Sequence, residues 1–490
     1  MRITLAIDQS TSATKALLID PVAGRLIDRV SVEHRQIYPQ PGWVEHDAEE
    51  IWQSTLAAIG RLPRQSIDRV SITNQRETVV VFDRKSGVPL HNAIVWQCRR
   101  GTEICDELNR AGHGSMVTAW TGLKIDPYFS ASKLAWLVRN RPEIAARLRD
   151  GSAVAGTIDA YLIHRLTGGR VFATDHTNAS RTLLFDIRAL RWDERLCGLF
   201  DVPIHALPEV RDSTTNFGDT DAGGRLVQPA PIIGVMGDSQ ASLFAHRCFR
   251  PGTAKVTLGS GSSVLLNIGS ECRPGGDAAV TTVAWTHQSS PTYSYEGIIN
   301  CTGATIQWLR DRLQLIGDAT ETEAIAASVP DNGGVYLVPA FAGLGAPHWS
   351  AGAKAAIVGL TAHATRAHVV RAALESIAFQ VRDVLDAMRG AGGVSLQAVH
   401  ADGGATRNRF LMQFIADMTG LRIIAADLPD CSPIGAALAG LFGSGQCRGY
   451  DDLSSLPYEH TSYSPQMPRD RADALHRDWR RAVQQVLAGA

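Results

Sequence analysis

The sequence predicts an α/β protein with mixed sheets, built from two related domains. Strand-like apolar runs alternate with amphipathic helical segments along the 490 residues, a pattern typical of α/β architectures. A chain of this length exceeds what one hydrophobic core usually holds, so we expect two large domains. A layout of strand, small-residue turn and strand occurs twice, far apart in the chain, which indicates that the two domains are related.

The two hairpins set the expected domain boundary. The first has strands over 3–7 and 15–19 around a Ser/Thr turn over 9–13. The second has strands over 254–258 and 264–266 around the Gly/Ser turn 259–263. We place the joint just before the second hairpin, near 247–251, which gives an N-terminal domain over 1–247 and a C-terminal domain over 248–490.

Helices and further strands are expected between and after the hairpins. Asp47 can cap a helix that runs through Ile51 and Leu56, because an aspartate at this position accepts from free backbone N–H groups. Segments 371–388 and 469–487 repeat apolar residues at helical spacing. We expect the last of these helices to pack on the protein rather than on a membrane. Short strands are expected at 94–96 and 334–338.

Composition excludes several classes of function. The formal net charge is −1, with 44% hydrophobic and 20% charged residues, so no general field attracts nucleic acid. No apolar stretch is long enough to span a bilayer. The eight cysteines are scattered without a Cys-x-x-Cys pair, which favours reduced thiols over disulfides or zinc. We expect a cytoplasmic protein without a membrane or nucleic-acid partner.

Three aspartates point to the chemistry. Asp8, Asp238 and Asp402 each close an apolar run and open a turn of small residues. Side chains at strand ends project into a cleft, and small residues let backbone N–H groups approach phosphate oxygens. The pattern predicts an ATP-phosphate and Mg²⁺ site assembled from distant segments. Asp8 would hold Mg²⁺ mostly through water.

The turn after Asp8 supplies the expected phosphate donors. Thr11, Ser12 and Lys15 offer two hydroxyls and an ammonium group to the β- and γ-phosphates of a nucleotide.

Nine segments carry a resemblance to a known family. They are YPQPGWVEHD (38–47), TNQRET (73–78), NAIVWQCRR (92–100), DPYFS (126–130), KLAWL (133–137), TNASR (177–181), IQWLRD (306–311), GLGAP (343–347) and DGGA (402–405). By these segments the chain resembles the FGGY carbohydrate kinases over nearly its whole length, and within that family the members that phosphorylate glycerol.

The resemblance implies a fold and a reaction. It implies two actin-like (ribonuclease H-like) ATPase domains with the catalytic cleft between them, and a homodimer or homotetramer. ATP would transfer its γ-phosphoryl group to a primary hydroxyl of a small polyol. Asp238 would be the catalytic base and, together with Asp8, a ligand of Mg²⁺. Such transfer depends mostly on positioning and charge stabilisation.

The resemblance also implies the binding residues. Those for the polyol are Arg76, Glu77, Trp96, Tyr128 and Asp238. Those for the nucleotide are Thr11, Ser12, Lys15, Ser260, Gly303, Gln307, Gly404 and Asn408. Arg76 would donate to two neighbouring hydroxyls. Because neighbouring residues of a strand point to opposite faces, Arg76 and Glu77 can share a ligand only where the strand ends or bulges.

The sequence departs from the pattern of the glycerol-phosphorylating members at several places, including the stretch 431–435 and three single positions. Ser239 and Ser263 stand where those members usually have Gln and Phe, and Lys15 stands where they have Arg. We add Ser239 and Ser263 to the polyol site, which the two small side chains make roomier and more polar. Glycerol, converted to glycerol 3-phosphate, is the first candidate substrate. Erythritol, threitol, xylulose and ribulose are the alternatives, and a catalytically silent nucleotide sensor is a third hypothesis.

Overall fold

The computed structural model describes residues 2–276, 279–427 and 430–489. A six-stranded mixed sheet forms the centre of the N-terminal half. Its strands, in spatial order, are β13 (Asn216–Thr220), β14 (Ala230–Gly237), β5 (Arg69–Asn74), β1 (Thr4–Gln9), β2 (Ala13–Asp20) and β3 (Arg25–Glu33).

A seven-stranded mixed sheet forms the centre of the C-terminal half. Its strands, in spatial order, are β17 (Val280–His287), β18 (Ser290–Ile299), β16 (Ser262–Gly269), β15 (Thr253–Leu258), β21 (Ala398–Asp402), β22 (Arg422–Ala426) and β23 (His460–Tyr463).

The two sheets repeat one pattern of strand pairing. In the first, β3, β2 and β1 form an antiparallel meander, and β5 and β14 then add in parallel. In the second, β18, β16 and β15 form the meander, and β21 and β22 add in parallel. An antiparallel strand, β13 or β23, closes each series. The prediction of two related α/β domains from the two hairpins is confirmed.

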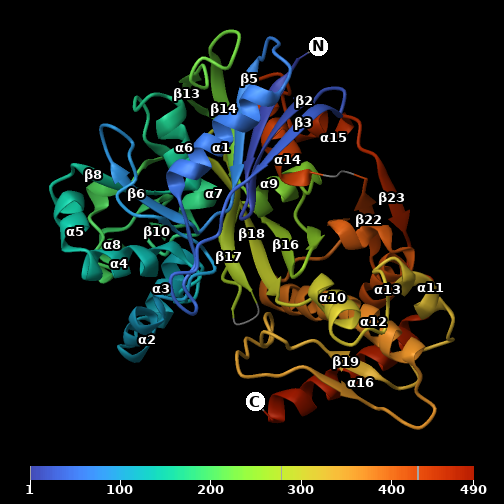
Figure 1. Cartoon of the computed structure of the whole chain (residues 1–490). Helices are drawn as coiled ribbons and strands as arrows, with labels where there is room; N and C mark the ends of the chain where they lie inside the picture. Colours follow the sequence, from blue (N-terminus) through green and yellow to red (C-terminus); the bar gives the residue numbers. More distant parts are fainter. Residues whose placement is uncertain (1, 277–278, 428–429, 490) are drawn as a thin grey trace.

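Helices cover both sheets and extend the two halves, which Figure 1 colours from blue to green and from yellow to red. The N-terminal half contains α1 (Ala48–Arg61), α2 (Thr102–Arg110), α3 (Gly114–Thr121), α4 (Ser130–Asn140), α5 (Pro142–Arg149), α6 (Ile158–Leu166), α7 (His176–Ala179), α8 (Glu194–Leu199) and α9 (Asp238–Ala245). The C-terminal half contains α10 (Gly303–Asp311), α11 (Glu321–Ala327), α12 (Arg366–Gly392), α13 (Arg409–Thr419), α14 (Cys431–Gly443), α15 (Tyr450–Ser455) and α16 (Arg469–Ala488).

Smaller sheets complete the architecture. One has four strands, in the order β4 (Glu45–His46), β7 (Ala93–Ile94), β6 (Val79–Asp83) and β8 (Ala153–Thr157). Three have two strands each: β9 (Ala173–Asp175) with β12 (Glu209–Arg211), β10 (Phe185–Asp186) with β11 (Arg191–Trp192), and β19 (Tyr336–Val338) with β20 (Ala356–Val358).

The predicted helices form for the expected reasons. Asp47 caps α1 by accepting from the backbone N–H groups of Glu49 and Glu50. The apolar face of α16 buries Trp479 and Val483 in the core of the C-terminal half. Packing of this face on the protein is therefore confirmed.

Helices α9 and α14 pack tightly against each other and join the two halves. Helix α14 comes from the C-terminal half but packs on β14, β5, β1 and β2 of the first sheet. Helix α9 contacts β14 of the first sheet and β15, β16 and β17 of the second. A side chain at Gly435 of α14 would overlap the carbonyl group of Ala241 in α9, so glycine permits this close approach.

Two negative findings concern the described residues. None of the eight cysteines forms a disulfide within the described ranges, as their spacing predicts. Among the helices described, none is long and apolar enough to cross a bilayer.

Candidate active site

A cleft of about 670 Å³ lies where the two sheets face each other, and both halves of the chain line it. Most predicted site residues meet there: Asp8, Thr11, Lys15, Arg76, Glu77, Trp96, Tyr128, Asp238, Ser239, Ser260 and Ser263. Asp402, the third aspartate of the sequence pattern, also lines the cleft. Distant segments therefore meet at the ends of these strands, as the small-residue turns in the sequence predict.

Asp238 lies at the junction of β14 and α9, as the first residue of the helix. The backbone N–H of Ser239 donates to Asp238 Oδ1 over 2.6 Å, and the helix N-terminus favours the negative charge there. The Asp238 side chain keeps 42% of its surface exposed. Burial of its surroundings nevertheless raises the pKa of Asp238, while Arg76 opposes the rise. This carboxylate is accessible from the cleft and more basic than an ordinary aspartate.

Arg76 and Glu77 lie between strands rather than within one. Strand β5 ends at Asn74 and β6 begins at Val79, so the geometric condition for sharing one ligand is met. A Cβ atom added at position 237 would lie only 2.6 Å from Cγ of Arg76. Glycine at this position therefore leaves room for the arginine to cross the end of β14.

Glu296 on β18 holds the guanidinium group of Arg76. The Arg76 Nη1 and Nη2 atoms donate to its two carboxylate oxygens over 2.9 and 2.8 Å, and Nη1 of Arg181 lies 2.8 Å from Oε2. Burial alone would raise the pKa of Glu296, but Arg181 and Arg76 lower it to about 2. Both Nη atoms of Arg76 are thus bound by a carboxylate. This differs from the expectation that the guanidinium group donates two hydrogen bonds to substrate hydroxyls. Its Nε edge faces Asp238.

Two aromatic rings form one wall of the cleft. Trp96 and Tyr128 meet edge to face, with ring centroids 5.5 Å apart. The indole N–H of Trp96 donates to Thr11 Oγ1 over 2.9 Å, which links this wall to the first turn. Such a surface suits the carbon chain of a small polyol.

The first hairpin places Asp8 and Lys15 side by side, since they pair in register across β1 and β2. Lys15 Nζ lies 3.3 Å from Asp8 Oδ2 and 3.0 Å from Asp430 Oδ1. Burial raises the pKa of Asp8 to about 6, against the opposing charge of Lys15. Carboxylates are the ligands that Mg²⁺ prefers, together with water and phosphate oxygens. The donor set of Asp8 and Asp238 therefore fits this ion.

The second hairpin places Ser260 and Ser263 on the opposite side of the cleft. Ser263 Oγ lies 3.4 Å from the ammonium nitrogen of Lys255. Lys255 is almost fully buried on β15 and also lines the cleft.

Five predicted nucleotide residues are not part of the lining described for the cleft: Ser12, Gly303, Gln307, Gly404 and Asn408. Gly303 opens α10, and its N–H donates to the carbonyl of Gly259 beside the second turn. Gln307 is exposed on the same helix, and Gly404 opens a short 3₁₀ turn two residues after Asp402. Asn408 caps α13 by accepting from Leu411 N–H.

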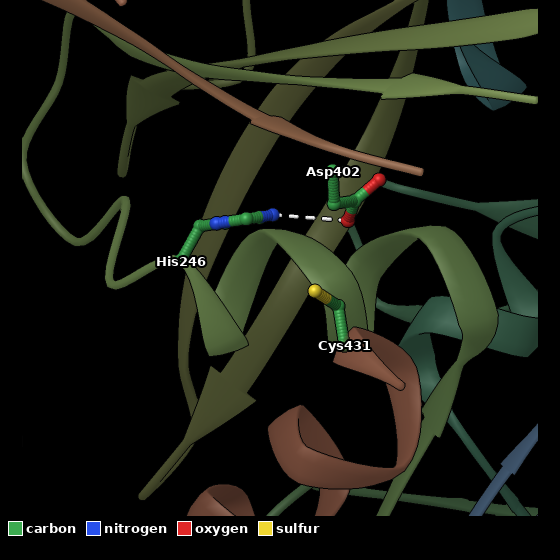
Figure 2. Close-up of side chains that lie close together, drawn as sticks. All are labelled: His246, Asp402 and Cys431. Carbon is green, nitrogen blue, oxygen red and sulfur yellow. Dashed lines mark hydrogen bonds and ion pairs between the residues drawn. The ribbon is translucent and has the colours of Figure 1, made fainter. Parts of the chain in front are cut away.

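A buried cluster at the edge of the cleft, where Asp402 and Cys431 line it, ties α9 to β21 (Figure 2). Possible ligand atoms of His246, Asp402 and Cys431 lie within 4.8 Å of one another. Asp402 Oδ2 already accepts from Ser242 Oγ over 2.6 Å and lies 2.9 Å from His246 Nε2. Burial opposes ionisation of Asp402, but His246, Lys255 and Ser242 hold its pKa well below the usual range. Hydrogen bonds account for this arrangement.

Sequence reasoning missed four charged residues of the site. They are Lys255, Glu296 and Asp430, which line the cleft, and Arg181, which supports Glu296 from the loop after α7. Lys255 and Glu296 are the single charged residues of β15 and β18, and each lies in a buried stretch of its strand. A lone charge in a buried strand is itself a signal of function, because an unpaired buried charge is costly.

Comparison with known proteins identifies the family to which the chain belongs. The N-terminal domain of the FGGY family of carbohydrate kinases matches residues 3–245, and its C-terminal domain matches residues 254–444. Glycerol kinase 1 of Thermotoga maritima is 45% identical over 489 residues, covering 99% of each chain. A glycerol kinase of Dechloromonas aromatica is 47% identical over 494 residues, covering 99% of this chain and 97% of the relative.

Solved structures agree with these matches. The glycerol kinase of Plasmodium falciparum, crystallised with ADP, superposes with a TM-score of 0.94 at 34% identity, covering 99% of this chain and 98% of that one. A xylulose kinase of Lactobacillus acidophilus has a TM-score of 0.90 at 20% identity, covering 100% of this chain and 99% of that one. A likeness at this identity shows the fold alone.

Fold, cleft and matches together define a carbohydrate kinase, a phosphotransferase with an alcohol group as acceptor. The chain belongs to the FGGY family.

Proposed function

We propose that this enzyme transfers the γ-phosphoryl group of ATP to a primary hydroxyl of glycerol and forms glycerol 3-phosphate. Full-length relatives named glycerol kinases, at 42% to 47% identity, support the substrate. The observation that carries the chemistry is the carboxylate of Asp238, which opens into a cleft lined by both halves of the chain.

Asp238 is the base in this proposal. It accepts the proton of the acceptor hydroxyl while the oxygen attacks the γ-phosphorus in line with the departing ADP. Its raised pKa suits this role, because a stronger base takes a proton more readily. A carboxylate that is accessible from the cleft also supports catalysis over the silent-sensor hypothesis.

The remaining cleft residues position the two substrates. Arg76, Glu77, Trp96 and Tyr128 bind the polyol, with Ser239 and Ser263 beside it. Thr11, Ser12, Lys15 and Ser260 bind the phosphates, and Gly303, Gln307, Gly404 and Asn408 bind the rest of the nucleotide. Asp8 and Asp238 would hold Mg²⁺, which screens phosphate charge when bound. The domain division proposed is 1–247 and 248–490.

A longer polyol or a ketose is the second candidate substrate. Both Ser239 and Ser263 line the cleft, and their small hydroxyl side chains leave room and hydrogen-bonding capacity for additional hydroxyl groups. Erythritol, threitol, xylulose and ribulose test this alternative.

The experiment is an acceptor screen. Purified protein with MgATP is incubated with glycerol, erythritol, threitol, dihydroxyacetone, xylulose or ribulose, and ADP release is followed with Asp238→Asn as the control. The highest kcat/KM with glycerol supports the proposal. A higher value with a four- or five-carbon acceptor supports the alternative, and release with none of them contradicts both.

The proposal places the enzyme in the cytoplasm as a homodimer or homotetramer. Eight cysteines without a disulfide among the described residues support a reducing compartment. Light scattering coupled to size exclusion measures the assembly.

A further inference from the structure

Lys255 differs from the other inward-facing lysines in what surrounds its charge. Lys15 Nζ is offset by the carboxylates of Asp8 and Asp430, 3.3 and 3.0 Å away. Lys133 Nζ donates to three backbone carbonyls over 2.6 to 3.0 Å. Each of these two cations is therefore satisfied within the protein.

Lys255 has only hydroxyl partners. Its ammonium nitrogen donates to Thr257 Oγ1 over 2.8 Å and lies 3.4 Å from Ser263 Oγ. The side chain is only 1% exposed, and no ion pair of Lys255 occurs within the described ranges. Burying a charge without a counterion in contact is unfavourable. Asp402, Glu296 and Asp238 act on its charge only from farther away, so the ammonium group can take an anion supplied from the cleft as a direct partner.

The position of Lys255 identifies the anion. Lys255 and Thr257 share one face of β15, directly before the turn that places Ser260 in the cleft. Lys15 occupies the corresponding hairpin of the first sheet, so the two lysines flank the cleft from opposite sides. Asp238 also lies near Lys255, close enough to act on its charge. The group that must pass between the nucleotide and an acceptor beside Asp238 is the γ-phosphoryl group.

We propose that Lys255 is a further catalytic residue, which binds the γ-phosphoryl group of ATP and stabilises its negative charge during transfer. This inference rests on the proposed function, since it requires ATP as donor. Burial lowers the pKa of Lys255, and the surrounding carboxylates Asp402, Glu296 and Asp238 oppose this. A bound phosphate adds negative charge and favours the ammonium form further.

The step balances without an additional reactant. The acceptor hydroxyl oxygen forms a bond to the γ-phosphorus, and the bond from that phosphorus to the β,γ-bridging oxygen breaks. The hydroxyl proton passes to Asp238, and ADP leaves with the electron pair of the broken bond. Lys255 keeps its proton throughout and donates a hydrogen bond to a non-bridging oxygen of the transferred group.

The test compares nucleotides with and without the γ-phosphate. Lys255→Met removes the charge at similar size, and Lys255→Gln removes it but keeps hydrogen-bonding capacity toward Thr257 and Ser263. Calorimetric titration with Mg²⁺ measures the affinity of each variant for ADP and for AMP-PNP, a non-hydrolysable ATP analogue. Lys85→Met, on the exposed surface, is the matched control.

We expect the AMP-PNP affinity of both variants to fall at least about tenfold, while that for ADP stays within about twofold. Their kcat should fall about 10²- to 10³-fold, as when one donor to a developing charge is removed. Equal changes for the two nucleotides, or a raised acceptor KM alone, would overturn the inference. If Lys255→Met does not fold, Lys255→Gln decides.

The binding measurement separates this inference from the proposed function. It needs no acceptor, so a wild-type enzyme that phosphorylates none of the polyols would contradict the proposed substrate and still report on Lys255. Conversely, the wild-type enzyme could be active while the Lys255 variants bind ADP and AMP-PNP with wild-type affinity. That result would overturn only the role of Lys255.

Discussion

Nε of Arg76 lies 3.3 Å from Oδ1 of Asp238, so the arginine that Glu296 anchors also faces the proposed base. The contact links β18 of the second sheet to the junction of β14 and α9 in the first. The contact holds the Asp238 carboxylate in place, and the charge of Arg76 partly offsets the rise in the pKa of Asp238 that burial causes. Orientation of the base therefore depends on Glu296, which does not touch Asp238.

Glu296→Gln tests this dependence. The amide cannot offset the charges of Arg76 and Arg181, so the free energy of unfolding should fall by about 3 to 5 kcal/mol. We also expect kcat/KM for the acceptor to fall at least about tenfold, because Arg76 is no longer fixed. Denaturant unfolding and steady-state kinetics measure the two effects.

Glu209→Gln is the matched control, since Glu209 pairs with Arg211 at the surface. It should cost less than about 1 kcal/mol and leave the kinetics unchanged. Equal effects of the two substitutions would show that the buried network does not position the site.

The raised pKa of Asp8 predicts an acid limb of activity. Its pKa in the folded protein is about 6, against an ordinary value of 3.8. Ionised Asp8 is the form that binds Mg²⁺, so kcat/KM for MgATP should fall as pH drops through about 6. Asp8→Asn should be much less active, and its residual kcat/KM should lack this inflection. Persistence of the limb in the variant would assign it to another group.

The same shift predicts an effect on stability. Folding raises the pKa of Asp8, so the folded protein holds this proton more tightly than the unfolded chain does. The free energy of unfolding therefore falls as pH rises from 3.8 to about 6 and loses nothing further from Asp8 at higher pH. Without ligands, Asp8→Asn should therefore raise the unfolding midpoint relative to wild type at pH 8 more than at pH 4. Thermal unfolding at the two pH values measures this, and a midpoint difference independent of pH would contradict it.

Lys133→Met should weaken acceptor binding through the backbone. Lys133 is fully buried, and its Nζ holds the carbonyls of Pro127, Tyr128 and Phe129. Leaving them unpaired should cost about 2 to 5 kcal/mol of unfolding free energy and raise the acceptor KM, since Tyr128 lines the cleft. ADP affinity should stay within about twofold. A loss of ADP affinity as large as that of acceptor affinity would argue against a local effect.

Gly435→Ala tests the contact between α14 and α9. The new methyl group would overlap the Ala241 carbonyl, so α14 must move away from the helix that begins at Asp238. We expect a loss of about 3 kcal/mol or more and a lower kcat. Gly390→Ala, exposed near the end of α12 with no atom within 4 Å of the added Cβ, should be neutral or stabilise by up to about 1 kcal/mol.

Much of the fold could be predicted because local patterns agree with the global arrangement. The two hairpins appear as β1 with β2 and β15 with β16, and the cap at Asp47 forms as expected. The strand expected at 94–96 is shorter, because β7 ends at Ile94 and leaves Trp96 free to face the cleft. The crossing of α14 to the first sheet could not be predicted, since it depends on packing between distant segments.

The residues of the site likewise fall into those that local sequence patterns predict and those that they do not. Asp8 and Asp238 are predictable because strand ends and small-residue turns are local features. Glu296 and Lys255 come from the interiors of strands, and only the sheet register brings them to the cleft. In the sequence, the only sign of their importance is a charge between uncharged neighbours. This pattern indicates that the position matters, but it does not predict what the residue does.

The most direct test of the account is a single-turnover measurement with γ-³²P-labelled ATP and glycerol. Wild-type enzyme should form labelled glycerol phosphate in a one-to-one ratio with ADP. Asp238→Asn should bind ADP within about threefold of wild type and form product about 10²- to 10⁴-fold more slowly, the range for loss of a general base. A variant rate within about threefold of wild type, with nucleotide binding intact, would contradict the role of Asp238.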